Sequence, residues 1–440
     1  MLVVAGATRA EPRSGRDCSD KSQNGPTVLI ERKSDACNVP DRAQVERRRP
    51  KPQERPGSLP GATVDGLLDL VKTYNPELAA AALDREAAVA RIYPAGALDD
   101  PMVNLTRDQG FRQTLLTVSQ DFPLWGKRRV REEVAEANAT AARGREGGVK
   151  AELEEQVKMV FAQYYEAAQA IRITRDIRGL LQGVAGSARA RYAQGLGNQS
   201  DAIRADLERT RLDPELSMLE RNEQVAKAKI NALIGGPADA PLAPPTALRR
   251  VPPAVTLHIE ALIARARETN PTLVTARAEI AAAGGEQALV DKSWYPDVTV
   301  SVGVTDLPNM SPRATAGVGV KVPFQWGVRE AKAREATAKK GAAQLRLDAA
   351  LLKIGTELQS ALATLSRAQR TEDLLKHALT PQSEAAYSAA LASYQQGRSD
   401  LAPVLEAARQ RLQIRIELLK VRTEALTALA TIERMVGGEL

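Results

Sequence analysis

The chain repeats itself at a nearly constant interval, and this duplication limits the possible folds more than any other feature. The interval is 195 residues for the first pair of shared motifs and 202 residues for the last pair. A shift that stays this constant indicates a tandem duplication with small changes in loop length. The paired motifs are Asn75-Pro76-Glu77-Leu78 with Asn270-Pro271-Thr272-Leu273, Phe122-Pro123-Leu124-Trp125-Gly126 with Val322-Pro323-Phe324-Gln325-Trp326-Gly327, Tyr192-Ala193-Gln194-Gly195 with Tyr394-Gln395-Gln396-Gly397, and Ile234-Gly235-Gly236 with Val436-Gly437-Gly438.

Each repeat is predicted to have the same order of elements: a helix, a β-hairpin, a very long helix, a brief turn and another helix. A Pro- and Ala-rich linker joins the two repeats, and a polar, Pro-containing N-terminal segment is predicted to be a disordered tail. The expected boundaries are 1–60 for the tail, 61–236 for the first repeat with its hairpin at 98–121 and turn at 192–200, 237–255 for the linker, and 256–440 for the second repeat with its hairpin at 296–323 and turn at 394–400.

The long helices dominate the predicted structure. Aromatic residues are only 3% of the chain, which suits long helices packed along narrow seams better than a bulky globular core. Residues 126–191 and 327–393 are each expected to form one helix on the order of 100 Å long. Leucines recur at three- and four-residue steps from Leu401 to Leu429, as in a coiled coil. A loosened turn or kink is expected at Gly144, Gly147 and Gly148 and at Pro214, which disfavour helix.

Four short segments alternate apolar and polar residues and predict two β-hairpins. The clearest has Val298, Val300, Val302 and Val304 on one face and Thr299, Ser301 and Gly303 on the other. About nine residues is the length that a tilted strand needs to cross a lipid bilayer. Soluble hairpins packed on a core would have the same strand pattern. The position of the aromatic residues favours the membrane, because all three tryptophans flank strands at what would be one level. The predicted membrane-interface girdle comprises Tyr93, Phe122, Trp125, Trp294, Tyr295, Phe324 and Trp326.

Four strands cannot close a barrel, and lipid tolerates no open strand edge. The chain is therefore expected to oligomerise in the membrane. Two copies would give eight strands and three would give twelve strands with a wider lumen, so a homotrimer suits a conduit.

Charge and composition disfavour several other classes of function. The net charge is +7, but basic and acidic residues interleave along the helical tracts, so no nucleic-acid partner is expected. Cys18 and Cys37 both lie in the predicted tail, and only two histidines occur, so no metal site and no cofactor are expected. The chain has no Gly-rich phosphate loop and no nucleophile elbow, so we do not expect an enzyme. No clear signal peptide is seen at the N-terminus.

Over about residues 63–440, the combination of these features resembles the TolC family of outer-membrane efflux proteins. The duplicated order, the Asn-Pro-Glu-Leu opening, the Phe-Pro-Leu-Trp-Gly-Lys-Arg sequence at 122–128 and the two Tyr-x-x-Gly turns carry the resemblance. That sequence and Leu98-Asp99-Asp100-Pro101-Met102 look most like the CzcC/CusC-like heavy-metal branch. The resemblance implies a mainly helical chain with a membrane β-barrel portion: a coiled-coil tube plus a trimeric, 12-stranded barrel.

The resemblance also implies a function and partners. The chain would be the outer-membrane channel of a tripartite efflux system, extending into the periplasm. It would be a passive duct for metal ions or drugs delivered by an inner-membrane RND-type pump through a periplasmic adaptor protein. The alternative is a soluble periplasmic or cytosolic coiled-coil scaffold, which explains the helices but leaves the amphipathic strands unexplained.

In this family the two turns form the periplasmic tips that close the pore, and the matching residues here are the candidate gate. We expect Asp201 to accept a hydrogen bond from the Tyr394 hydroxyl, and Arg398 to donate to Ser200 or Asp201. The alternative is that Tyr394 packs at the turn and Arg398 is solvated. The complete set of candidate gate residues is Tyr192, Gly195, Leu196, Ser200, Asp201, Tyr394, Gly397 and Arg398.

Overall fold

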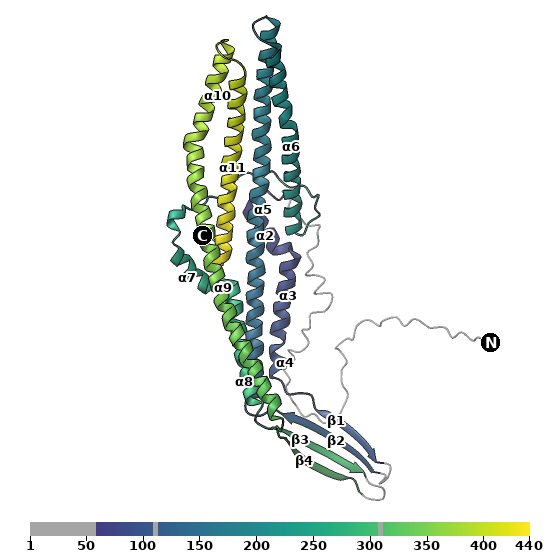
Figure 1. The fold of residues 1–440 in the computed structure, drawn as a ribbon. Coiled ribbons are helices and arrows are strands. Elements are labelled where there is room, and N and C mark those ends of the chain that lie inside the picture. Colours follow the sequence, from purple (N-terminus) through teal and green to yellow (C-terminus); the bar gives the residue numbers. More distant parts are fainter. Residues whose placement is uncertain (1–58, 109–112, 307–310) are drawn as a thin grey trace, which may run out of the picture. The chain divides into compact units, whose positions relative to one another are not determined.

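A computed structural model describes residues 59–108, 113–306 and 311–440 (Figure 1). The chain divides into two units, 1–48 and 49–440, and all described residues belong to the second. Most of the predicted tail, both cysteines and the centres of the two hairpin loops lie outside the described residues. The elements are α2 (Val64–Tyr74), α3 (Pro76–Ala90), α4 (Ile92–Gly96), β1 (Met102–Asp108), β2 (Gln113–Phe122), α5 (Lys127–Ala193), α6 (Gln199–Leu233), α7 (Ile259–Thr269), α8 (Pro271–Lys292), β3 (Asp297–Asp306), β4 (Arg313–Lys321), α9 (Trp326–Leu374), α10 (Thr380–Gln395) and α11 (Ala402–Val436).

Helix α5 is unbroken for 67 residues, or about 100 Å at 1.5 Å per residue. The hydrogen-bonded helix is not interrupted at its glycines, so the loosened turn expected there is absent. Gly144 instead marks the place where α5 approaches α8, since a Cβ added there would lie 2.3 Å from the Thr275 hydroxyl oxygen. Helix α6 also continues through Pro214. Ion pairs on both sides of this proline fasten α6 to α5 and favour the continuous helix: Arg178 with Asp213 at 2.9 Å, and Arg175 with Glu220 at 2.7 Å.

The second long helix is divided, contrary to the expectation of one helix over 327–393. Helix α9 ends at Leu374, a π turn covers Leu375–Leu379, and α10 follows from Thr380. Pro381 explains the break, because proline lacks the N–H that the preceding turn would use. The Leu375 carbonyl accepts from both the N–H and the hydroxyl of Thr380, the hydroxyl at 2.7 Å, and these two bonds span the widened turn.

In each repeat the opening Asn-Pro motif contacts the end of the last helix of that repeat. Asn75 caps α3 by accepting from the N–H groups of Glu77 and Leu78 at 2.9 and 3.0 Å, and its amide donates to the Leu233 carbonyl at 2.8 Å. Asn270 repeats this arrangement in the second repeat, where its amide donates to the Met435 carbonyl at 2.8 Å. Each Asn-Pro motif therefore begins a helix, and its asparagine also hydrogen-bonds to the end of the last helix in the same repeat.

Substitution of Asn270 by alanine should lower the free energy of unfolding by about 2 kcal/mol, because the cap and a buried hydrogen bond are lost together. Asn270 is only 4% exposed, so water cannot replace its amide. Urea unfolding followed by circular dichroism measures the effect. Thr63→Ala is the matched control, since Thr63 caps α2 with a single 3.4 Å bond in an exposed position. Equal losses in the two variants would contradict the account of Asn270.

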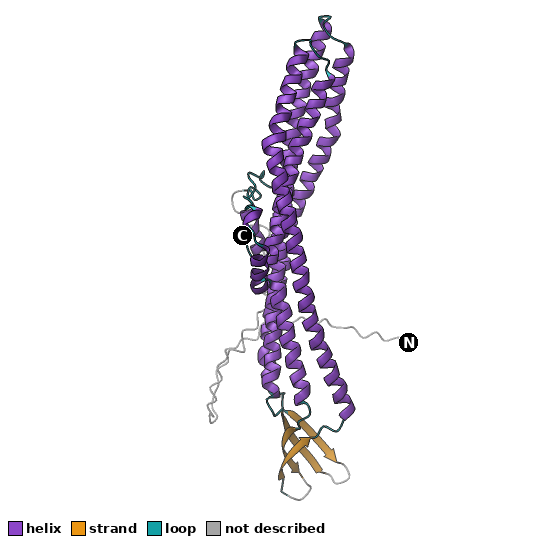
Figure 2. Ribbon diagram, turned by 60° about the vertical axis from the view of Figure 1, so that its left-hand side comes forward, coloured by secondary structure: helices purple, strands orange, loops and turns teal. Residues whose placement is uncertain are grey.

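The four strands form one antiparallel sheet in the order β1-β2-β3-β4, drawn in orange in Figure 2. The two hairpins therefore join through β2 and β3. The register places the predicted apolar residues in rows across the sheet. Within the described residues, the outer edges of β1 and β4 have no partner strand. The rows are Val103, Val118, Val302 and Ala316, and Leu105, Leu116, Val304 and Ala314, with polar rows such as Asn104, Thr117, Gly303 and Thr315 between them.

The helical core forms three clusters of buried residues. One lies in the first repeat between α2, α5 and α6, and includes Leu67, Phe161 and Ile230. A second lies in the second repeat between α7, α8, α9 and α11. The third joins α5 and α6 to α10 and α11 near the two turns, and so holds the far ends of both repeats together.

Candidate functional site

Both turns end their long helices with the same backbone geometry. Gly195 and Gly397 have φ of +72° and +73°, a conformation that favours glycine. In each turn the glycine N–H and the next N–H donate back into the last helical turn, which is the Schellman arrangement. The bonds are Gly195 to Tyr192 at 2.9 Å and Leu196 to Arg191 at 2.8 Å in the first turn, and Gly397 to Tyr394 at 3.0 Å and Arg398 to Ser393 at 2.9 Å in the second.

Arg191 links the two turns. From the last turn of α5, its Nη1 donates to the carbonyls of Tyr394 and Gln395, both at 3.0 Å, and its Nη2 donates to the Leu196 carbonyl at 3.1 Å. Its guanidinium also lies over the Tyr394 ring, 5.2 Å from the centroid. A cation at the carbonyl ends of α5 and α10 complements both helix dipoles. One side chain thus joins the first turn to the second.

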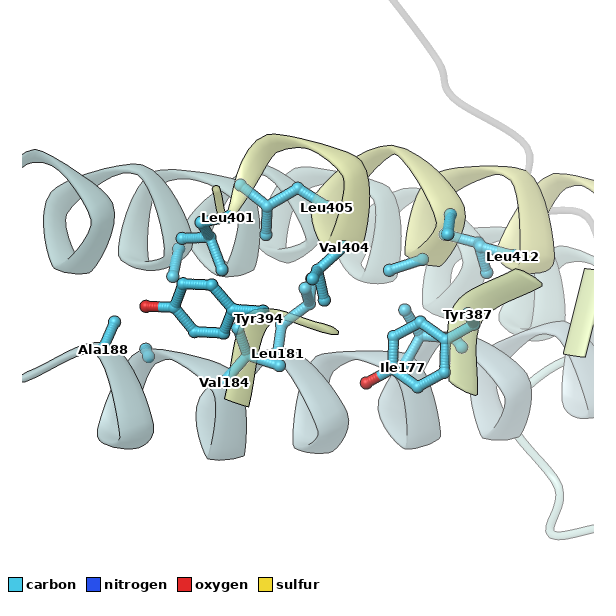
Figure 3. Close-up of a cluster of buried hydrophobic side chains, with 14 of the residues drawn as sticks. Ile177, Leu181, Val184, Ala188, Tyr387, Tyr394, Leu401, Val404, Leu405 and Leu412 are labelled. Carbon is cyan, nitrogen blue, oxygen red and sulfur yellow. The ribbon is translucent and has the colours of Figure 1, made fainter. Parts of the chain in front are cut away.

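Tyr394 is part of the third core cluster and not an exposed latch. It is 3% exposed and packs among Ala188, Val184 and Leu401 (Figure 3). Burial raises the pKa of Tyr394, and the nearby carboxylate of Asp201 raises it further, so the phenol is neutral over the physiological range.

The structure corrects the predicted hydrogen bonds of the candidate gate. The Tyr394 hydroxyl is buried and has no hydrogen-bond partner among the described residues, which include Asp201, so the predicted bond to Asp201 is wrong. Arg398 is exposed, and within the described residues its side chain makes no bond to Ser200 or Asp201. Ser200, Tyr192 and Leu196 are exposed as well. The packed tyrosine and solvated arginine match the alternative that the sequence left open.

One feature of the sequence could have identified Arg191 as a functional residue. The repeat places Ser393 at the corresponding position of the second turn, so the arginine is present in only one of the two copies. Arginine is common in the last turn of a helix, where it offsets the dipole, so this difference did not single it out.

A second link between the repeats joins the other two helices that meet at the turns, α6 and α11. Glu208 of α6 is 8% exposed and accepts hydrogen bonds from Arg409 of α11 and from Arg211, at 2.8 and 2.9 Å. The bond from Arg409 and the charges of both arginines lower the pKa of Glu208, against the opposing effect of burial. Within the second repeat, Glu384 of α10 receives a short hydrogen bond from Arg415 of α11.

Acid should weaken this link. Because the pKa of Glu208 is lower in the folded chain than its ordinary 4.5, its carboxylate stabilises the fold above about pH 4.5. That contribution is lost as the pH falls through the folded pKa. We expect Glu208→Gln to lower the urea midpoint at pH 7 and to leave a smaller further loss between pH 5 and 3. Glu220→Gln, in an exposed pair on the same helix, is the control: it should lower the midpoint less than Glu208→Gln and leave the acid response unchanged. An unaltered acid response in Glu208→Gln would contradict the prediction.

The predicted aromatic girdle lies where helices and sheet meet. Trp125 packs on Tyr295 with ring centroids 5.2 Å apart, and Trp294 packs on Trp326 at 5.6 Å. The Trp125 indole N–H donates to the Pro296 carbonyl at 3.1 Å, which joins the exit of β2 to the entry of β3. Phe122 ends β2, while Tyr93 in α4 and Phe324 after β4 are the most exposed of the set, at 85% and 76%. The structure thus brings four girdle residues into two pairs and leaves three outside them.

Two features are absent from the described residues. None of these helices contains a stretch with the length and hydropathy of a membrane-spanning helix. In the same part of the chain, no group of three or more His, Cys, Asp or Glu side chains is arranged to hold a metal ion.

Comparisons with known proteins agree with this architecture. A model of the family described as outer membrane efflux protein matches residues 67–236 and 262–438. The cobalt-zinc-cadmium resistance protein CzcC of Cupriavidus metallidurans is 26% identical over 393 residues, 88% of this chain and 92% of that protein. Among solved structures, the outer-membrane channel OprN superposes with a TM-score of 0.73 at 19% identity, covering 85% of this chain and 90% of that one. CusC gives 0.72 at 16% identity, covering 88% and 98%. These likenesses confirm the predicted TolC-like fold.

Proposed function

The chain belongs to the outer membrane efflux protein family and is the outer-membrane channel of a tripartite efflux system; we propose that it works there as a homotrimer and a passive exit duct. In this proposal, an inner-membrane RND-type pump delivers the cargo through a periplasmic adaptor protein. The duct itself catalyses no reaction and needs no cofactor.

The sheet is the observation that carries the proposal. Its apolar rows include Val302, Val304, Val318 and Leu105, which are 47 to 72% exposed. Such rows suit lipid on one side and water on the other. The free edges of β1 and β4 would leave backbone N–H and C=O groups unpaired in a bilayer, at a cost of several kcal/mol each. Three copies, pairing β4 of one with β1 of the next, would satisfy every edge and make twelve strands.

The helices suit the other half of a duct. Helix α5, about 100 Å long, leads away from the sheet to the turn at Gly195. We place the two turns at the periplasmic tips, where pump and adaptor would meet the channel. The contact of Arg191 with the second turn would then hold the tips of one copy together in the closed state. Partner binding would open the gate by favouring a conformation in which the tips separate.

We propose divalent metal cations as the cargo. The support is the relative named a cobalt-zinc-cadmium resistance protein, together with a second relative named the nickel and cobalt resistance protein CnrC, 27% identical over 265 residues. A duct takes its cargo from its pump, so the cargo is tested in cells that also carry the cognate pump and adaptor.

Fractionation and conductance test the duct. We expect a trimer that resists heating in the outer-membrane fraction, and ion conductance when it is placed in a planar bilayer. A monomer that stays in solution without detergent would instead support the soluble scaffold. For the cargo, deletion of the gene should lower tolerance to cobalt, zinc or cadmium salts and leave tolerance to organic drugs unchanged. The reverse pattern would reject metal cargo and retain the duct.

A further inference from the structure

Helix α9 carries a stripe of mostly small or apolar residues on its outer face. From Val328 to Leu352 the residues of this stripe follow alternating steps of three and four, the spacing of a coiled-coil seam. Leu345 and Leu352 are 69% and 75% exposed, and Val328 is 49% exposed. We call this stripe the α9 seam. Between these three residues lie Ala331, Ala338, Ala342 and Ala349, and Glu335 is the one charged member.

The opposite face of α9 is the one that packs inside the chain. Its buried residues include Ala336, Ala343 and Ile354, and α8 is its neighbour. A helix on the surface of a protein needs one apolar face for packing, and α9 has two. Leucines that are exposed one heptad apart therefore indicate that the α9 seam packs on a helical surface outside its own copy.

A groove on the first-repeat side of the molecule has the complementary shape. It lies between α3 and α5, has a volume of about 810 Å³ and is lined largely by small side chains. Small residues on one surface leave room for large residues from another, as in the knobs-into-holes packing of helices. We call it the α3–α5 groove. Its alanines are Ala81, Ala87, Ala88, Ala95, Ala135 and Ala142.

The groove and the seam lie on opposite sides of each copy. Helix α3 packs on α5, α5 on α8 and α8 on α9, in the same order as β1 to β4 in the sheet (Figure 1). In the proposed trimer β4 of one copy pairs with β1 of the next, and the same rotation brings α9 of one copy beside α3 of the next. We propose that the α9 seam of each copy packs into the α3–α5 groove of the next copy. The inference rests on the proposed trimer and extends its contact from the sheet to the helices.

Seam and groove also lie at the same height. Helices α5 and α9 both begin next to the sheet, at Lys127 and Trp326. Leu345 and Glu146 are each 19 residues further along, and Glu146 forms an ion pair with Arg85 of α3 at 2.7 Å. Rotation about the axis of a tube leaves height unchanged, so Leu345 of one copy would face the next copy within about one turn of Arg85. That part of the groove is lined by Ala81, Ala87 and Ala88.

Charges beside the two surfaces are complementary. Arg346 follows Leu345 on α9, is exposed, and makes no ion pair in the described residues. Asp84 lines the groove, is exposed, and has no ion pair in the same part of the chain. Arg145 and Glu146, which lie at the same height, are already paired within the copy. Packing of the seam would bring Arg346 within reach of Asp84 of the next copy.

Cross-linking tests the contact in the assembled, full-length protein. The background carries Cys18→Ser and Cys37→Ser, which remove the two native cysteines, so that only added cysteines react. Leu345→Cys with Ala87→Cys, treated with a short bismaleimide in outer-membrane vesicles, should give covalent dimers and trimers on a denaturing gel. Because the two positions lie on opposite sides of one copy, the linkage must join different copies.

A second cysteine pair controls for chance collision. Leu345→Cys with Met218→Cys uses another exposed position of the first repeat, in α6, which also packs on α5. The ion pair of Glu220 with Arg175 places Met218 roughly 45 Å further along α5 than the groove. This pair should remain monomeric on the denaturing gel. Equal cross-linking in the two pairs would indicate chance collision and overturn the proposal.

Charge exchange gives an independent test. Asp84→Arg and Arg346→Asp should each lower the fraction of trimer that survives heating in detergent by about fivefold, because each of three contacts gains a like-charge pair. The two changes combined should recover the wild-type fraction. Arg334→Asp is the matched control, since it makes the same charge change on α9 roughly 18 Å from Arg346 and should not rescue Asp84→Arg. Equal rescue by Arg334→Asp, or no rescue by Arg346→Asp, would contradict packing of the seam at this height.

Failure of this inference is distinguishable from failure of the proposed function. A heat-resistant trimer that conducts ions but shows no cross-link between Leu345→Cys and Ala87→Cys would retain the duct and reject the seam. Wild-type protein that is monomeric and soluble without detergent would refute the duct and the seam together.

Discussion

Replacement of Arg191 by alanine should raise the single-channel conductance of the reconstituted protein, because the two turns lose their one shared side chain. The contacts at stake between the turns are two hydrogen bonds to the carbonyls of Tyr394 and Gln395 and the stacking of the guanidinium on the Tyr394 ring. Charged hydrogen bonds and a cation–π contact of this kind together contribute about 3 kcal/mol. At 1.4 kcal/mol for each factor of ten, the closed-to-open equilibrium would shift by about a hundredfold.

Two control variants make this prediction specific to Arg191. Tyr394→Phe keeps the ring and the backbone carbonyl and removes a hydroxyl that has no hydrogen-bond partner in the part of the chain that the structure describes, so conductance should stay unchanged. Arg398→Ser removes an exposed side chain and should also have no effect. These outcomes reverse the expectation from the family pattern, in which Tyr394 and Arg398 form the latch. If Tyr394→Phe raised the conductance and Arg191→Ala left it unchanged, that latch would be supported and the role given to Arg191 would be rejected.

The organisation of the chain could be predicted from sequence because it depends on repeated local signals. Val298 to Val304 alternate with polar residues, and the alternation alone specifies which face of β3 is apolar. The Tyr-x-x-Gly motifs predict turns because glycine readily adopts the positive φ that such a turn requires, as Gly195 and Gly397 do. The alternation along a strand and the positive φ at a turn depend on neighbouring residues alone and require no knowledge of distant partners.

Contacts between distant residues could not be predicted in the same way. Arg191 reaches carbonyls 203 and 204 positions away, and backbone carbonyls leave no mark in a sequence. The pairing of Asn75 with the Leu233 carbonyl, 158 positions away, is hidden for the same reason. The break at Leu375–Leu379 could have been predicted from Pro381. The helical pattern on both sides of it indicated one continuous helix instead.

The glycines of α5 show how a local rule can mislead. Glycine lowers helix propensity by about 1 kcal/mol relative to alanine, so Gly144, Gly147 and Gly148 suggested a loosened turn. Propensity is a weak guide where two helices touch, because the space that a missing side chain leaves can be filled by a neighbour. At Gly144 the neighbour is α8: a Cβ there would lie 2.9 Å from the Thr275 amide nitrogen and 3.1 Å from the Pro271 carbonyl oxygen.

Gly144→Ala should therefore lower the free energy of unfolding by about 3 kcal/mol, since the added methyl group must push the backbone of α8 away from α5. Gly148→Ala, one turn further along the same helix, should raise it by about 1 kcal/mol, because nothing lies within 4 Å of a Cβ at that position and alanine is the better helix former. Urea unfolding followed by circular dichroism measures both. The opposite signs separate the two explanations of these glycines. If Gly144→Ala were also stabilising, α5 and α8 would not be closely packed there, and the glycines would mark a flexible turn as the local rule suggested.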